Sequence, residues 1–242
     1  QVIVFPLMAL SINDVIPWQN AWMYYGVFIL AVLLPVFWFL LRNHEHKTHK
    51  TWQDKITADE KDDVVDTVKH WARMDALKDW RIYAIMSITM LSPFVGTVIF
   101  FYQGELAASL SLTPLEFATA FPFFTIATVI SSLIAGTIID MYGEKPALVS
   151  YPILYSFGLF FLTRTWGLPI TYVGTMLIGA STGIMSTTGG PLLAKLYGTK
   201  YLSSIKSIMM SAAILASALS PFIFGYLMDQ GFEIKTLFSS II

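Results

Sequence analysis

The chain is dominated by apolar runs that are long enough to cross a lipid bilayer. A membrane-spanning helix needs roughly 20 mostly apolar residues, and 55% of the 242 residues are hydrophobic while only 13% are charged. An ordinary soluble domain has about 25% charged residues. Complete runs cover residues 18–41, 82–104, 115–139, 147–163, 169–194 and 203–228, and shorter ones cover 2–12 and 234–242. The sequence therefore predicts an all-α, polytopic membrane protein, and we expect it to be a piece of a longer chain, cut inside a helix.

The positions of Lys and Arg predict how these spans are oriented. The chain has 15 such residues, and all except Arg164 and Lys235 lie in segments on one side of the alternating spans. Cytoplasmic loops of membrane proteins carry the excess of positive charge. We therefore expect segments 42–81, 140–146 and 195–206 to face the cytoplasm.

A short turn between two spans carries the most specific pattern in the chain, G-x-x-x-D-x-x-G-x-K. Gly136 permits close packing at the end of one helix, and Gly143 permits a tight turn. Asp140 can pair with a cation or with the N-terminus of a neighbouring helix, and Lys145 stands where the next span begins. This pattern resembles the cytoplasmic loop signature of the major facilitator superfamily of secondary transporters, in which the turn would latch a closed state.

The resemblance also implies an order of helices. It implies a helical bundle made of two six-helix halves, with the long charged loop between them. Residues 1–41 would then hold the fifth and sixth helices, 42–81 the central loop, and 82–242 the seventh to the twelfth helices, the last one truncated. Such transporters contain inverted three-helix repeats, and Gly225 with Asp229 repeats the G-x-x-x-D step on the opposite membrane face.

Small residues predict close packing between helices. Small-xxx-small steps occur in two of the spans. Gly179, Gly183 and Gly190 lie in the span 169–194, and Ala212, Ala216 and Ser220 lie in the span 203–228. Such surfaces let helices slide during transport, but static packing needs them equally. Prolines inside the spans, including Pro93, are expected to bend or end helices because proline cannot donate a backbone hydrogen bond.

Neutral polar side chains are the candidates for substrate contact, because no charged residue lies near the middle of a complete span. The candidates for lining a cavity are Tyr102, Gln103, Thr128, Ser132, Thr182 and Ser186. Hydroxyl groups also hydrogen-bond to their own helix backbone, which is the alternative for most of these residues. Glu116 follows Thr113 at the spacing of a capping box, so we expect it to cap a helix.

The lack of charge in the spans bears on the substrate. In the superfamily that the chain resembles, carriers of carboxylates commonly place an Arg or Lys in the eighth or eleventh helix. The predicted eighth helix has neither, and Lys206 lies near the cytoplasmic end of the eleventh. We therefore expect an anionic substrate to need a cation from the other half, and the sequence assigns neither H⁺ nor Na⁺ as a coupling ion.

The charged loop 42–81 contains few functional signals. Residues 59–80 fit either an amphipathic helix on the membrane surface or a solvated linker. His44, His46 and His49 are weak evidence for a metal site because they lie in a charged loop without cysteine. The sequence shows no Walker loop and no nucleophile elbow. We expect no metal, no cofactor and no nucleic-acid partner.

The resemblance implies a secondary active transporter, not an enzyme, in the cell (plasma or inner) membrane. Its partners would be the lipid bilayer and a small solute, which it would move by alternating access. The alternative is a multi-span protein that is not a carrier, either an integral-membrane enzyme or a sensor whose loop recruits a partner. An enzyme should have clustered His, Asp or Glu at helix ends, whereas the His cluster lies in the loop. A channel is disfavoured because no filter segment is visible.

Overall fold

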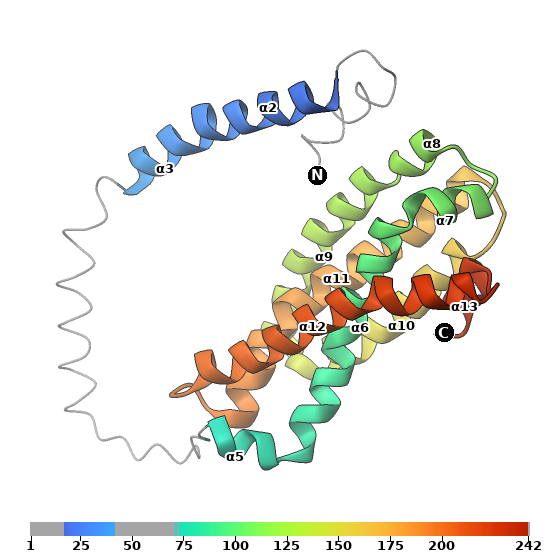
Figure 1. Ribbon diagram of the computed structural model, residues 1–242. Helices are drawn as coiled ribbons and strands as arrows, with labels where there is room; N and C mark the ends of the chain where they lie inside the picture. The colour runs from blue at the N-terminus through green and yellow to red at the C-terminus, as the bar shows by residue number, and fades with distance from the viewer. Residues whose placement is uncertain (1–16, 42–70, 72, 242) are drawn as a thin grey trace, which may run out of the picture. The chain divides into compact units, whose positions relative to one another are not determined.

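The computed structural model describes residues 17–41, 71 and 73–241, and every regular element within these residues is a helix (Figure 1). The chain divides into an N-terminal unit and a bundle, each of which we describe by itself. The apolar run at 2–12, most of the charged loop, and His44, His46 and His49 lie outside the described residues.

The N-terminal unit contains one continuous apolar helix. Helix α2 (Trp18–Phe28) passes through a π-helical turn, η1 (Ile29–Leu33), into α3 (Leu34–Leu41). The π turn ends two residues before Pro35, which has no backbone N–H to donate to the turn before it. Phe39 is 75% exposed, as suits a helix that lies in lipid. The span predicted at 18–41 is confirmed, because this helix is long and apolar enough to cross a membrane.

The bundle contains the remaining helices. They are α5 (Arg73–Lys78), α6 (Trp80–Phe101), α7 (Gln103–Ser109), α8 (Pro114–Ala118), α9 (Phe121–Tyr142), α10 (Glu144–Leu162), α11 (Leu168–Tyr197), α12 (Leu202–Asp229) and α13 (Ile234–Ser239). Helices α6, α10, α11 and α12, and α8 together with α9, are each long and apolar enough to cross a membrane. The five spans predicted between residues 82 and 228 are therefore confirmed, with ends that differ by a few residues.

Two of the predicted spans are interrupted near one end, 82–104 between α6 and α7 and 115–139 between α8 and α9. Helix α6 stops at Phe101, and Tyr102, with φ −100° and ψ 31°, separates it from α7. The Tyr102 hydroxyl donates to the Pro221 carbonyl of α12 over 2.9 Å, which fixes this break against a neighbouring helix. The predicted cap at the start of α8 is confirmed, because Thr113 and Glu116 form a capping box in which each side chain accepts from the other residue's backbone N–H.

Close helix packing in the bundle depends on glycines of α11. Side chains at Gly179 and Gly183 would collide with the backbone carbonyls of Phe124 and Thr128 on α9. Gly174 of α11 and Gly158 of α10 face each other, and a Cβ at Gly158 would lie 2.9 Å from the Gly174 oxygen. Glycine therefore allows the backbones of α9, α10 and α11 to touch.

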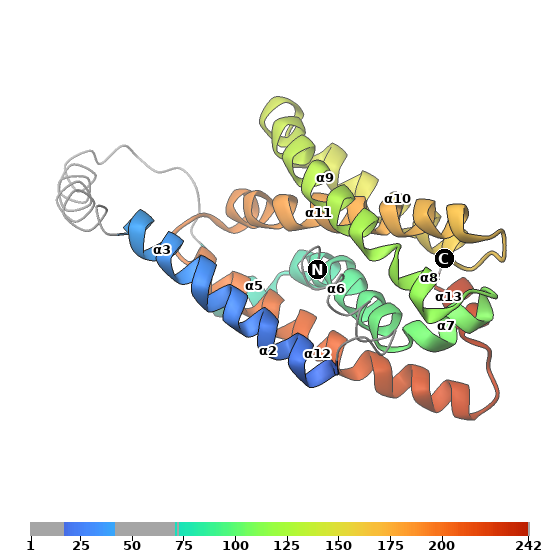
Figure 2. The ribbon, with the colours of Figure 1, turned by 90° about the horizontal axis from the view of Figure 1, so that it is seen from above.

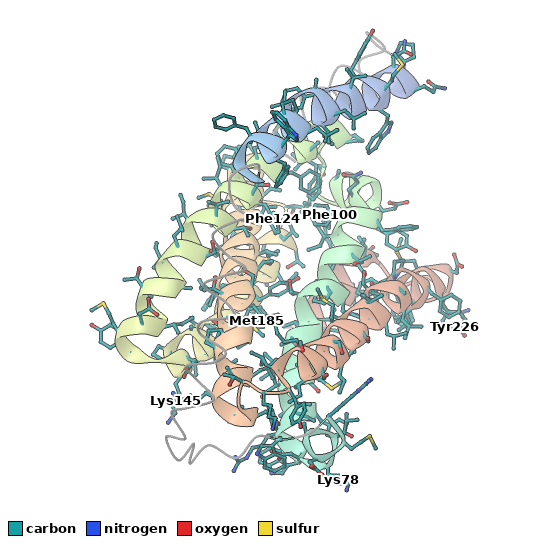
Figure 3. All side chains as sticks on the ribbon, turned by 90° about the vertical axis from the view of Figure 1, so that its left-hand side faces the viewer. Lys78, Phe100, Phe124, Lys145, Met185 and Tyr226 are labelled. Atoms are coloured by element: carbon teal, nitrogen blue, oxygen red, sulfur yellow. The ribbon has the colours of Figure 1, made fainter. Side chains whose placement is uncertain are left out.

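The helices of the bundle form two groups. Helix α11 packs extensively on α9 and α10, and α12 packs on α6, whereas α11 has few contacts with α6 or α12. Figure 2 shows α9, α10 and α11 on one side of the bundle and α6 and α12 on the other. We call the boundary between α11 and the α6–α12 pair the seam. Phe100 of α6 and Phe124 of α9, 5.9 Å apart between ring centroids, join the two groups at one end (Figure 3).

Candidate functional site

A cavity of about 550 Å³ lies along the seam. Its walls come from α6, α11 and α12, and they combine methionine and aliphatic side chains with hydroxyl groups and one lysine. Figure 3 places Met185 on the side of α11 that faces α6 and α12. The cavity therefore offers a mainly apolar surface with a few polar groups, which is the usual character of a small-molecule site.

The α6 wall of the cavity includes Ser92 and Pro93, and a side chain of α10 hydrogen-bonds to the helix backbone at this point. The Tyr151 hydroxyl of α10 accepts a hydrogen bond from the Ser92 N–H and donates to the Ile88 carbonyl, over 3.1 and 3.2 Å. These two groups are also the donor and acceptor of one i to i−4 step of the helix. A proline inside a helix is a known cause of bending, and the hydroxyl oxygens of Ser92 and of Thr182 of α11 lie 3.3 Å apart across the seam.

The opposite end of the cavity is formed by Gly189 and Gly190 of α11 and the first turns of α12. A side chain at Gly189 would meet no atom within 4 Å, and a Cβ at Gly190 would lie 3.5 Å from the Lys206 Nζ atom. The absence of side chains on α11 thus leaves room for the Lys206 amine. Lys206 is the one charged residue in the described lining.

The structure brings two of the predicted cavity residues, Thr182 and Ser186, into the lining. Thr128 instead donates to the Phe124 and Gly179 carbonyls at the α9–α11 contact. Ser132 donates to the Val129 carbonyl of its own helix. Sequence reasoning did not select Ser92, Gly189 or Gly190 as lining residues, because a run of small residues does not show which helix it faces.

Two further candidates, Tyr102 and Gln103, lie at the break between α6 and α7. Tyr102 contacts α12, where a Cβ at Gly225 would lie 2.6 Å from its hydroxyl oxygen, and Gln103 is exposed. Asp229, the proposed repeat partner of Asp140, is the exposed last residue of α12. None of these residues belongs to the cavity lining.

The G-x-x-x-D-x-x-G-x-K turn joins α9 to α10. Gly143 has a φ of 82°, which glycine adopts without strain, and its N–H donates to the Ile139 carbonyl to end α9. Gly136 lies at contact distance from α11, since a Cβ there would be 3.9 Å from the Thr187 methyl carbon. Asp140 and Lys145 are both exposed, and neither has an ion pair among the described residues.

An ion pair that the sequence analysis did not predict lies beside this turn. The Lys195 Nζ atom of α11 donates to Oε2 of Glu144, the first residue of α10, over 2.6 Å. The Glu144 side chain is only 14% exposed, whereas that of Lys195 is 62% exposed. The predicted order of the spans places the start of α10 and the end of α11 on the same side of the membrane, so the sequence could have indicated this ion pair.

Among the described residues no group of His, Asp or Glu is placed to hold a metal ion.

These features define a class of protein, a multi-pass helical membrane bundle with a solute-sized cavity between its helices. The family model described as Major Facilitator Superfamily matches residues 82–241, which is more than half of the 242-residue chain. The chain therefore belongs to the major facilitator superfamily of membrane transporters. Comparison with curated proteins gave no match, and comparison with solved structures gave none either.

Proposed function

We propose that the protein is a secondary active transporter that moves a small solute by alternating access. The observation that carries this proposal is the seam cavity, in a chain of a transporter family. Helices α6, α11 and α12 bear the glycine, proline and hydroxyl residues that allow backbones to bend and shift. Since α11 makes few contacts with α6 and α12, a rearrangement of these helices can open the site to either membrane face.

The proposal includes an arrangement in the membrane. Residues 1–41 hold the fifth and sixth helices, 42–81 the central loop, and 82–242 the seventh to the twelfth. Segments 42–81, 140–146 and 195–206 face the cytoplasm of the cell, with the plasma or inner membrane as the location. The positive charge in these segments supports this orientation.

A latch at the cytoplasmic surface completes the proposal. Asp140 is exposed at the end of α9 and has no ion pair among the described residues. A carboxylate there is unfavourable for its own helix and favourable for a facing cation or helix N-terminus. Asp140 therefore holds the inward-closed state by a contact made outside the described bundle, while Gly136, Gly143 and Lys145 shape the turn. Gly225 and Asp229 are its counterpart in the inverted repeat.

Solute counterflow tests the proposed function. The whole protein is reconstituted in proteoliposomes loaded in turn with unlabelled glucose, choline, lactate, succinate and inorganic phosphate, and the matching labelled solute is added outside. A carrier exchanges bound solute for bound solute, so one panel member should accumulate transiently above equilibrium. Flux without this overshoot would indicate a channel, and lack of flux for every panel member would contradict the proposal for these solute classes.

A further inference from the structure

We propose that the seam cavity binds an uncharged, mainly apolar solute that carries an N–H or O–H group, and that the hydroxyl oxygens of Ser92 and Thr182 accept its hydrogen bond. This inference rests on the proposed function and adds the substrate class to it. The protons of the hydroxyl groups in the middle of the cavity are already used within the protein, which leaves their oxygens as acceptors.

Ser92 and Thr182 lie at the depth where a solute site is expected. Ser92 is near the midpoint of α6 (Trp80–Phe101) and Thr182 is near the midpoint of α11 (Leu168–Tyr197), and both helices are long enough to cross a membrane. Both residues line the cavity and are only partly exposed. Secondary transporters bind their solutes near the middle of the bilayer, so these two hydroxyl groups are well placed to contact one.

The protons of this hydroxyl pair are both accounted for. Thr182 donates to the Ile178 carbonyl over 2.9 Å, so Ser92 is the donor in the contact between the two hydroxyl groups. A hydroxyl group has one proton and two lone pairs. The oxygens of Ser92 and Thr182 therefore keep lone pairs for a solute but no free proton. Thr182 can donate to a solute only by giving up its bond to the Ile178 carbonyl.

The neighbouring hydroxyl groups of the lining follow the same pattern. Three of them donate to carbonyls of their own helices, and they belong to Thr89, Ser186 and Ser207. The other side-chain donors among the described lining residues, the Ser203 hydroxyl and the Lys206 amine, are exposed in the first two turns of α12. The cavity therefore offers acceptors at its middle and donors at its exposed end.

A backbone carbonyl of α6 adds an acceptor on the same wall. In an α-helix each carbonyl accepts from the N–H four residues later, but Pro93 has no N–H for the Thr89 carbonyl. Thr89 and Pro93 both line the cavity, so this carbonyl lies on the helix face that the two lining residues share. A donor on the solute can take the place of the missing N–H.

The main chain of Ser92 is held in position by α10. The Tyr151 hydroxyl accepts from the Ser92 N–H over 3.1 Å, and the Tyr155 hydroxyl donates to the Ser92 carbonyl over 3.5 Å. Both tyrosines are fully buried. A binding group that is fixed by packing and by further hydrogen bonds discriminates better between solutes than a loosely held one.

The rest of the lining disfavours a charged solute at this depth. The described lining residues include no Asp, Glu, His or Arg, and Lys206 lies at the exposed end. A cation at the middle would have no carboxylate as a partner, and an anion would meet hydroxyl oxygens whose protons are already used. Met185, Met209 and Met210 supply apolar surface for the body of the solute.

Protection of a thiol by two matched probes tests this solute class. Indole has one N–H donor, and benzofuran has the same ring shape with an oxygen acceptor and no donor. Ser186→Cys places a thiol in the lining one turn from Thr182, and its labelling by N-ethylmaleimide in the whole protein is followed by mass spectrometry of that peptide. We expect indole to protect the thiol at a free concentration about threefold or more below that of benzofuran, the effect of one hydrogen bond. Benzofuran is the more apolar probe, so apolar binding alone gives the opposite order.

Double substitutions show whether the two hydroxyl groups cause the preference. In the Ser186→Cys background, Ser92→Ala/Thr182→Val should abolish the preference for indole. The matched control is Ser132→Ala/Thr137→Val on α9, which removes two hydroxyl groups that donate to their own helix and lie outside the lining. This control should keep the preference. The labelling rate without a probe and monodisperse elution in detergent check that each variant is folded.

The outcomes separate this inference from the proposed function. Equal protection by indole and benzofuran would overturn the inference, as would a preference for indole that survives Ser92→Ala/Thr182→Val. Counterflow of choline, lactate, succinate or inorganic phosphate would also overturn it, because these panel members are charged, but would leave the carrier function intact. Lack of counterflow for every panel member would contradict the carrier function for those solutes, whereas thiol protection is measured without transport.

Discussion

Glycines of one helix serve opposite purposes in this bundle. Gly179 and Gly183 lie against the backbone of α9, where a methyl group would collide with carbonyl oxygens, whereas Gly189 faces open space in the cavity. The sequence predicted close approach at Gly179, Gly183 and Gly190 from their spacing alone. It could not separate contact from cavity, because spacing places residues on a helix face without identifying the neighbour of that face.

Alanine substitution should distinguish the two kinds of glycine. We expect Gly183→Ala to lower the free energy of unfolding by about 1–3 kcal/mol, because the added methyl group overpacks a contact with the rigid Thr128 carbonyl. Gly189→Ala should change it by less than about 0.5 kcal/mol. Thermal unfolding of both variants in detergent measures this difference. Equal melting temperatures would mean that α9 and α11 are not packed as described.

Helix positions followed from hydropathy, but helix distortions did not. The spans were predictable because lipid requires roughly 20 apolar residues per crossing, and Pro93 indicated a bend in α6. The hydrogen bonds of the Tyr151 hydroxyl to Ser92 and Ile88 were not predictable, because they depend on a residue of another helix. The break at Tyr102 likewise lies where a side chain hydrogen-bonds to a distant helix.

Removal of the Tyr151 hydroxyl should destabilise the α6 element. Tyr151 is fully buried, and Tyr151→Phe removes a hydroxyl that hydrogen-bonds to the Ser92 N–H and to the Ile88 carbonyl. We expect a loss of about 1 kcal/mol in unfolding free energy, read as a lower melting temperature in detergent. Tyr226→Phe on the exposed face of α12 (Figure 3) is the matched control, since this side chain is 60% exposed. A loss of similar size in the control would count against the role of the Tyr151 hydroxyl.

Substitution of Asp140 in the turn between α9 and α10 should affect the transport rate more than the stability of the protein. Asp140 is exposed and has no ion pair among the described residues, so Asp140→Asn should leave the melting temperature unchanged. It should slow transport by up to about fivefold, because an exposed charge contact contributes about 0–1 kcal/mol. Counterflow by the whole carrier, matched for protein amount, measures the rate. Normal transport by a well-expressed Asp140→Asn variant would contradict the latch.

At the scale of the bundle, the two helix groups meet along the seam and in a buried core shared by α6 and α10. Helices α9, α10 and α11 are held together by glycine contacts, and α6 is held to α12, but few contacts join α11 to α6 or α12. The sequence predicted six-helix topology through a family resemblance and could not divide the bundle into groups, because that division depends on which small residues meet. The cavity with Thr182, Ser186 and Lys206 lies along this boundary.

Two engineered disulfides should show whether the groups move relative to each other. The hydroxyl oxygens of Ser92 and Thr182 lie 3.3 Å apart across the seam, and those of Thr97 and Ser217 lie 2.6 Å apart between α6 and α12. The γ-atoms of each pair are close and the chain has no cysteine of its own, so each cysteine pair should form one bond on oxidation, which mass spectrometry verifies. We expect oxidised Ser92→Cys/Thr182→Cys to lose at least about tenfold in counterflow rate, with recovery on reduction, and oxidised Thr97→Cys/Ser217→Cys to keep its rate. If both oxidised variants transported normally, the bundle would move as one rigid body and the seam would serve only to hold the solute.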